Sequence, residues 1–345
     1  MMERGLVRTL SQSKFALVAT VALGLAACDK GSKSGSSAGG STAGKGMAGA
    51  SAVAPKGGLS RALSMMPVNS EMVIALDFKQ VRASALWKKY EDKVMGKIGK
   101  DLEEFKAICG WDPMDKAAGA LMAGRGREMD EMTVFVKGFD KPSVTECLKK
   151  AEAKGKADND GRALVVDGDY FEMTKPGKDP IRFMFADADT IVLQRVPGSD
   201  DMAGKAALEK VLAAKDGEGL MSSPMFSSLI DATDTSAALW FVVNGAASFM
   251  KDSPMPMKLV AVFGSVKASD GIDGAVKLRL GSPDDAKGMV SMAEMGMGQL
   301  KGSPFADLAD GVKISAKGSD VVSTFKFTQA QLDKIAGLAA MGGGF

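Results

Sequence analysis

The chain has 345 residues, of which 46% are hydrophobic and 25% charged, with 44 lysines and arginines against 42 aspartates and glutamates. This composition is typical of a globular protein and excludes a wholly disordered, collagen-like or polytopic membrane protein. Histidine is absent, which excludes Ser-His and Cys-His nucleophile pairs, histidine-ligated zinc and the usual proton shuttle near neutral pH.

Residues 1–27 have the pattern of an export signal. Arg4, Arg8 and Lys14 precede an apolar run that is too short to span a bilayer as a helix. The run ends in Leu-Ala-Ala directly before Cys28, which resembles the bacterial lipoprotein signal, whose cysteine is lipidated and becomes the first residue after cleavage. We therefore expect acyl chains on Cys28 to anchor the protein to a membrane of the bacterial cell envelope, facing the periplasm or the cell surface.

The segment from Cys28 to residue 58 consists almost entirely of glycine, serine, alanine and lysine. Such a segment cannot bury enough apolar surface to fold, so we expect a flexible tether with a root-mean-square span of about 30 Å. Its four lysines favour transient contact with an anionic surface, although a solubilising spacer is the simpler interpretation. The body that follows, residues 59–345, has 37 basic and 40 acidic residues, so nucleic acid is not an expected partner.

Hydrophobic periodicity and turn residues divide residues 59–218, the first predicted half, into strands and helices. Gly110 and Pro113 end the second helix, and Pro142 begins the third. The predicted strands are 71–78, 118–123, 132–137, 163–166, 170–174, 181–186 and 190–195, and the predicted helices are 81–95, 101–108, 142–153 and 201–214.

Two cysteines of this half remain once Cys28 is assigned to lipid. Because Cys109 and Cys147 form an even pair in an oxidising compartment, we predict a disulfide that clamps the two helical patterns holding them. Two separate buried thiols are the alternative. A redox-active pair is not expected because the chain has no Cys-x-x-Cys.

A second series of elements follows in residues 219–345, the second predicted half. Strand 275–281 followed by the helix at Pro283 has the same plan as strand 133–138 followed by the helix at Pro142. This repeated order predicts an α+β protein of two related halves, each a mainly antiparallel sheet with helices packed on it. The predicted strands are 238–243, 258–267, 274–280, 312–317 and 321–327, and the predicted helices are 246–251, 283–300 and 329–340.

Several segments of the first half resemble a known group of sequences. They are residues 67–78, residues 84–87, Phe105-Lys106 and the run Cys109-Gly110-Trp111-Asp112-Pro113. They resemble the start of a family of bacterial envelope proteins, often lipoproteins of myxobacteria and their relatives, and the resemblance covers residues 64–240. It implies the class and the compartment. The family has no established activity, so the resemblance implies no functional residue.

Two short motifs could carry chemistry. Ser248 and Lys251 match the Ser-x-x-Lys of penicillin-interacting enzymes, but the companion Ser-Asp-Asn and Lys-Thr-Gly motifs are missing. Asp158 to Gly161, with Asp167, resembles a calcium loop, yet Lys156 stands where the first carboxylate belongs. A solvated turn is therefore the better interpretation of the second motif.

Methionine is the one unusual residue in the composition, with 24 copies. Met289, Met292, Met295 and Met297 lie in one predicted helix, and thioether clusters can bind Cu(I). Without histidine or a free cysteine to assist, we favour adaptable packing or an apolar ligand surface over copper binding.

These observations predict a lipid-anchored envelope protein that binds or scaffolds and is not an enzyme, with no cofactor and no metal. The expected partners are the membrane, through Cys28, and an apolar ligand or an envelope protein. One alternative is a carrier that holds a lipid or other apolar ligand in a cleft between the halves. The other is a histidine-free hydrolase that uses Ser and Lys or carboxylates.

Overall fold

The fold is described from a computed structural model that places residues 57–126, 131–195, 202–250, 257–300 and 306–340. The predicted signal, Cys28 and the tether up to residue 56 lie outside these described residues. Within them, no helix combines the length and the apolar character needed to cross a membrane.

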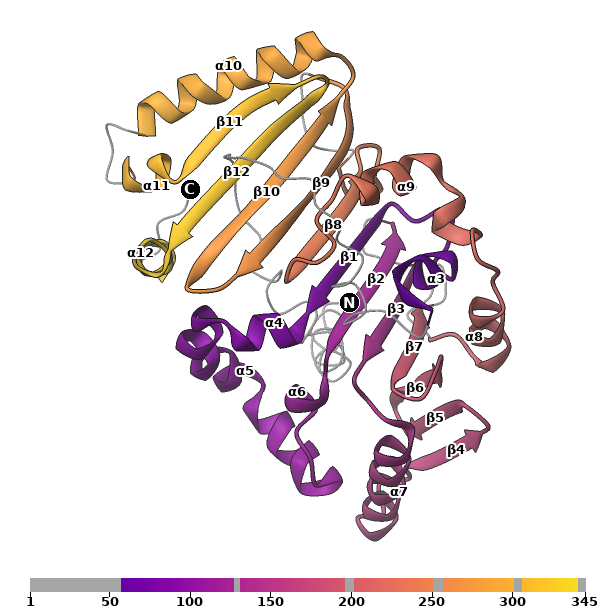
Figure 1. Ribbon diagram of the computed structural model, residues 1–345. Coiled ribbons are helices and arrows are strands. Elements are labelled where there is room, and N and C mark those ends of the chain that lie inside the picture. Colours follow the sequence, from indigo (N-terminus) through magenta and orange to yellow (C-terminus); the bar gives the residue numbers. More distant parts are fainter. Residues whose placement is uncertain (1–56, 127–130, 196–201, 251–256, 301–305, 341–345) are drawn as a thin grey trace, which may run out of the picture.

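Twelve strands form one antiparallel sheet in the order β11-β12-β10-β9-β8-β1-β2-β3-β7-β6-β5-β4 (Figure 1). The strands are β1 (Met72–Asp77), β2 (Gly119–Arg125), β3 (Glu131–Lys137), β4 (Ala163–Asp167), β5 (Tyr170–Lys175), β6 (Lys178–Phe185), β7 (Thr190–Arg195), β8 (Leu239–Asn244), β9 (Leu259–Ala268), β10 (Gly271–Leu280), β11 (Val312–Lys317) and β12 (Asp320–Thr328).

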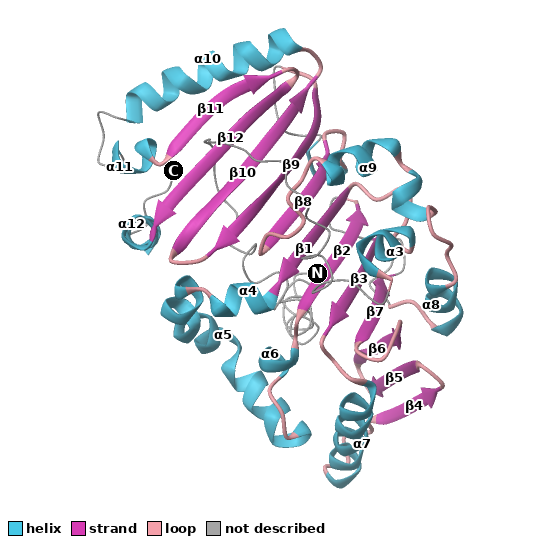
Figure 2. Ribbon diagram, viewed as in Figure 1, coloured by secondary structure: helices cyan, strands magenta, loops and turns pink. Residues whose placement is uncertain are grey.

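Helices precede, connect and follow the strands (Figure 2). They are α3 (Gly58–Ser64), α4 (Phe78–Ala83), α5 (Ala85–Cys109), α6 (Pro113–Lys116), α7 (Lys141–Ala157), α8 (Lys205–Leu212), α9 (Pro224–Asp231), α10 (Pro283–Leu300), α11 (Ala306–Asp310) and α12 (Gln329–Ala340), with 3-10 turns η2 (Gly219–Ser222) and η3 (Ser248–Met250). The α+β class with a mainly antiparallel sheet is thus confirmed.

The two predicted halves share a chain plan. β1, β2 and β3 form a meander, α7 follows, and β7 later returns to pair with β3. In the same way β8, β9 and β10 form a meander, α10 follows, and β12 returns to pair with β10. The antiparallel sheets of the two halves are continuous, because β1 pairs directly with β8 and joins all twelve strands.

Several helices differ from the predicted ones. The patterns at 81–95 and 101–108 belong to one helix, α5, which runs through the intervening residues to its end at Gly110. The sequence predicts no helix before residue 71, but α3 begins at Gly58, the last residue assigned to the predicted tether. The predicted helix 201–214 is the shorter α8, and Asp201 itself lies outside the described residues. The helix predicted at 246–251 is only the 3-10 turn η3.

Side-chain caps set several helix boundaries that bear on the site. The Ser84 hydroxyl accepts a hydrogen bond from the Trp87 N–H at 3.1 Å and begins α5. Gly110 ends α5 with a φ of 77°, a left-handed conformation that glycine adopts without strain. Asp140 begins α7, since its Oδ1 accepts from the Ser143 N–H at 2.8 Å.

The side of the sheet that we call face A is fully covered over its central strands. Its side chains include Val73, Leu121, Phe135, Trp240 and Phe263, and each is at most 1% exposed. They pack in one cluster with residues of α3, η2, α8 and α9. Face A therefore holds the main hydrophobic core.

The opposite side, face B, is covered at its two ends. Near β3 and β5–β7, side chains such as Phe171 and Phe183 form a second cluster that includes Val144 of α7. Near β10–β12, Leu278 and Leu280 pack with Met289 of α10 in a third cluster. The sheet is thus sandwiched between helices at different places on its two faces.

The two outer strands of the sheet have different protection. At β4, the Leu164 N–H donates to Glu152 Oε1 of α7 at 3.3 Å. At β11, Lys313 and Lys317 are exposed. An outer strand is a potential pairing surface for another chain, and both features disfavour such pairing.

Candidate functional site: an apolar face at the junction of the halves

The part of face B between its two covered ends lies where the halves meet. The register places Ile74 of β1 beside Phe241 of β8, and Met72 beside Val243. It continues to β9, where Val243 pairs with Val262. Because residues directly opposite in neighbouring strands share a face, these side chains form one row across three strands.

These junction side chains are half-buried, unlike their neighbours on face A. Met72, Ile74, Phe241, Val243 and Val262 are all of intermediate exposure, whereas Val73, Val242 and Phe263, the alternate residues of the same strands, are 0% exposed. Phe241, Val243 and Val262 belong to none of the three buried clusters. We call these five half-buried residues the junction row.

The junction row is uncharged. All of β1, β8 and β9 is described, and the face B positions of these strands hold only apolar side chains and Gly264. From β1 to β9 the row spans two strand spacings, or about 10 Å.

Helices from both halves contact each other near the β9–β10 turn, at one end of the strands that carry the junction row. α5 begins beside the β9–β10 turn, where the Ala85 N–H donates to the Ser269 carbonyl at 3.0 Å. Tyr90 of α5 then donates to Asp333 Oδ1 of α12 at 2.9 Å, and Lys89 forms an ion pair with the same carboxylate. The Lys89 ammonium, with help from Gln329 and Tyr90, lowers the pKa of Asp333.

A group of polar contacts around Glu71 lies at the opposite end of these strands, beside the start of β1. The Glu71 carboxylate accepts from the Ser248 N–H at 2.9 Å, from the Ser248 hydroxyl at 2.6 Å and from the Gly126 N–H at 3.1 Å. It thereby joins the start of β1 to the end of β2 and to η3. The Ser248 hydroxyl is thus engaged by a carboxylate, and Lys251, its partner in the Ser-x-x-Lys motif, lies outside the described residues.

The other candidate residues do not converge on this row. Asp160 forms ion pairs with Arg162 and Lys175, both at 2.7 Å, and these cations lower the pKa of its carboxyl. Asp158 pairs with Lys154, and Asp167 with Lys205. The aspartates of the calcium-like motif are therefore paired with lysine and arginine side chains, as expected for a turn at the protein surface. Among the described residues, no group of three or more acidic or cysteine side chains could hold a metal ion.

The methionines of α10 divide between the core and the solvent. Met289 packs in the third cluster and Met297 is 9% exposed, whereas Met292 and Met295 are 47% and 70% exposed. Four sulfur atoms that point to different sides of a helix cannot share one Cu(I) ion.

Cys109 and Cys147 lie at disulfide-bonding distance, with their Cα atoms 4.4 Å apart. This is the arrangement that the cysteine count predicts. The pair joins the end of α5 to α7, and so ties the first-half helices on the face B side to one another.

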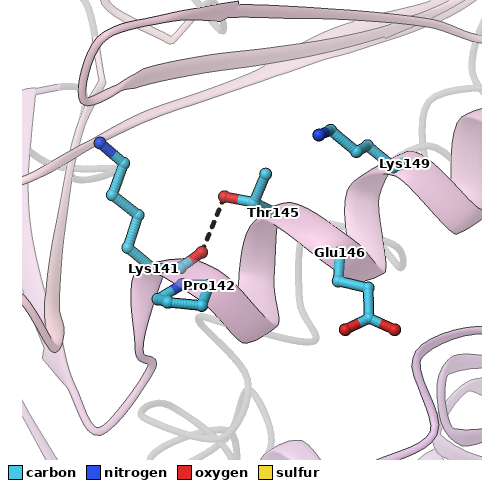
Figure 3. Close-up of a pocket in the computed structure, with 5 residues that line it drawn as sticks. All are labelled: Lys141, Pro142, Thr145, Glu146 and Lys149. Atoms are coloured by element: carbon cyan, nitrogen blue, oxygen red, sulfur yellow. Dashed lines mark hydrogen bonds between the residues drawn. The ribbon is translucent and has the colours of Figure 1, made fainter.

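A surface hollow lies elsewhere, along the first two turns of α7. Lys141, Pro142, Thr145, Glu146 and Lys149 line it (Figure 3). Its groups are engaged in local contacts: Thr145 donates to the Lys141 carbonyl at 2.7 Å, Lys141 pairs with Asp169 and Glu146 with Lys150. A shallow hollow with satisfied polar groups does not resemble an active site.

The comparisons with known proteins are sparse. No protein-family model and no curated protein matches the chain. Two crystal forms of TP0453, forms III and I, overlay with a TM-score of 0.47, with 11% and 10% sequence identity, over 79% and 80% of this chain and 96% of TP0453. An overlay at this level supports no conclusion about function.

Proposed function

We propose that this chain is a lipid-anchored protein of the bacterial cell envelope, of non-enzymatic binding type, and that its junction row binds an acyl chain of a lipid. The observation that supports this function is the half-buried state of Phe241, Val243 and Val262 on strands whose other face is fully buried. Contiguous apolar surface that no helix of the core covers is typical of binding sites for apolar groups.

The shape and chemistry of the row favour an acyl chain. It crosses three strands over about 10 Å and carries no charge, so it offers contact surface but no group for catalysis. An acyl chain gains about 0.8 kcal/mol for each methylene that it removes from water. A scaffolding role for the same face, with an envelope protein as the partner, is the competing interpretation.

The hydrolase alternative has less support. It requires ionisable groups that converge on a substrate, but the described carboxylates near the motifs of interest are engaged by lysine, arginine or backbone N–H groups. Ser248, the candidate nucleophile of the Ser-x-x-Lys motif, donates a hydrogen bond from its hydroxyl to the Glu71 carboxylate.

The test of the row is binding of a fluorescent fatty acid, with mass spectrometry of copurifying lipids. In Phe241→Gln we expect at least a tenfold loss of fatty-acid affinity, because an amide replaces the central ring of the row. Phe249→Gln is the matched control, since Phe249 is 40% exposed outside the row. Equal loss in both variants, or no binding by the wild type, would refute the row as the site and favour the scaffold.

The test of the anchor is metabolic labelling with palmitate. We expect label in the wild type and none in Cys28→Ser, which should accumulate as an unprocessed precursor. Equal labelling of the two proteins would contradict the lipoprotein proposal, whereas the result of the fatty-acid binding experiment would still stand.

A further inference from the structure

Face A changes its character at β10, where the helices that cover it end. α9 packs against β8, and the face A cluster extends no further than Ala261 and Phe263 of β9. Beyond β9, α10 and α12 lie against the strands, and α10 covers face B there. In Figure 1 the broad surface of β9, β10 and β12 is seen with no helix across it.

The register shows which side chains occupy this uncovered part of face A. Lys277 of β10 lies opposite Val322 of β12, which lies opposite Ser315 of β11. On the same basis the face carries five cations and two anions, namely Lys277, Arg279, Lys313, Lys317, Lys326, Asp273 and Asp320. We call these seven residues the basic face.

The basic face has more cations than anions: Asp273 lies opposite Lys326, and Asp320 lies between Arg279 and Lys317, which leaves a net charge of +3. Arg279 forms a two-pronged contact with Asp320, at 2.7 and 2.9 Å. Among the described residues, Lys313, Lys317 and Lys326 have no acidic group within ion-pair distance, although most other lysines near a carboxylate are paired. The body as a whole has more acidic than basic residues, so this concentration of cations runs against its net charge.

Lys277, which is more buried than the other lysines of the basic face, adds to the excess of positive charge there. Its Nζ donates to the Ala232 carbonyl at 2.8 Å and lies 5.2 Å from the centre of the Phe263 ring. Burial, together with the positive charges of Lys317 and Arg279, lowers its pKa. Neighbouring cations that disfavour one another's charge create a site that gains from an anion.

The chain emerges from the tether on the same face of the sheet. α3 is the first element after the tether, and its Leu59, Ala62 and Leu63 are in the face A cluster. If the preceding residues form the flexible tether of about 30 Å that their composition predicts, this attachment keeps face A within reach of the membrane to which Cys28 is proposed to be anchored.

We propose that the basic face docks on an anionic lipid surface, so that face A is turned toward the membrane and the junction row on face B is turned away from it. The inference depends on the proposed lipid anchor for its geometry, and on charge complementarity between lysines and lipid phosphates for its specificity. Such contacts weaken as salt rises, because the charges are exposed and screened.

The experiment uses the mature chain reconstituted into vesicles of phosphatidylcholine, with or without 30% phosphatidylglycerol. Lysines are acetylated with a water-soluble reagent, and the rate at each site is read by mass spectrometry. We expect Lys313, Lys317 and Lys326 to react at least threefold more slowly on anionic vesicles, and the protection to disappear at about 0.5 M salt. Lys149 of α7, exposed and on the face B side, is the internal control.

A charge-reversed variant, K313E/K317E/K326E, should lose the difference between the two kinds of vesicle, whereas K149E should keep it. Equal acetylation of the three lysines on both vesicles would overturn the proposal. If the protein carries no lipid and leaves the vesicles at high salt, the anchor is wrong. The docking proposal is then decided by sedimentation at low salt, where the wild type should bind anionic vesicles at least tenfold better than the triple variant, and equal binding would overturn it.

Discussion

Face A and face B share every strand of the sheet and differ in what lies over them. On β1, Val73 is 0% exposed while Ile74, the next residue, is half-buried. The cover of face A comes from short segments far apart in the chain, α3 before the sheet and η2, α8 and α9 between the halves. The comparison teaches that a strand with apolar residues on both faces requires cover on both, and that the part of face B between α7 and α10 is the place where we propose that a ligand supplies this cover.

The sharpest way to test this contrast is a pair of truncations of the same residue type. Phe135→Ala, on face A, should lower the free energy of unfolding by about 4 kcal/mol, because a fully buried ring leaves a cavity. Phe241→Ala, in the junction row, should cost only about 1 to 2 kcal/mol, because its ring is partly solvated already. Urea unfolding measures both. Equal losses would show that the two faces are equally packed.

The second test concerns the tie between α5 and α7. Reduction of the Cys109–Cys147 pair should lower the free energy of unfolding by about 4 kcal/mol and the melting temperature by several degrees, because the unfolded chain regains the freedom of a closed loop. Differential scanning calorimetry with and without reductant measures this shift. Thiols that react with alkylating agents in the oxidised, denatured protein would contradict the pairing.

A smaller effect is expected where α3 is fastened to face A. Arg61 donates to the Leu212 carbonyl at 2.8 Å and also to the Ala214 carbonyl, at the end of α8. Arg61→Ala should cost about 1 to 2 kcal/mol, because it removes charge-assisted hydrogen bonds that cap α8. Hydrogen exchange should accelerate in residues 58–64 and not in β10–β12. Unchanged exchange in α3 would show that apolar packing alone holds the cover in place.

The smallest effect is a pH dependence at the start of α7. The Lys116 ammonium and the Ser143 N–H lower the pKa of Asp140 to about 2, from an ordinary value near 3.8. Because the folded pKa lies below the unfolded one, the stabilisation is complete above pH 4 and is lost between about pH 4 and pH 2. The carboxylate is 44% exposed, so solvent screening keeps this contribution below about 1 kcal/mol.

Asp140→Asn keeps a helix cap but removes the titration, so it isolates this contribution. The difference in urea midpoint between wild type and variant should shrink from pH 6 to pH 2.5. A constant difference across that range would contradict the assignment.

The sequence predicts the strands well because their signals are local. Alternating or continuous apolar runs between Asp-Gly, Pro-Gly and Gly-Ser turns locate each strand to within a few residues. The sequence is less reliable for helices that are stabilised by packing against the rest of the protein and not by their own helix propensity. α3 has only seven residues and is held by its contacts with face A, and α5 continues through Gly96 and Gly99, which individually disfavour a helix.

The junction row shows a different limit. Ile74 and Phe241 are predicted in strands, but the pattern of β1 is apolar at almost every position and therefore predicts burial on both sides. Which side lacks a cover depends on where α3, α8 and α9 pack, and that is a property of the whole chain. The pairing of Cys109 with Cys147 is simpler, because it follows from a count.

The outer strands of the sheet have a consequence for how the protein behaves at high concentration. Val165 and Val166 of β4 are 52% and 44% exposed, a combination that would let a second copy add its own strand and extend the sheet into an aggregate. Glu152 occupies the Leu164 N–H that such a strand would use, and at the opposite edge Lys313 and Lys317 would bring like charges together. The same lysines that we assign to membrane docking therefore also oppose the edge-to-edge pairing of the sheets of two copies.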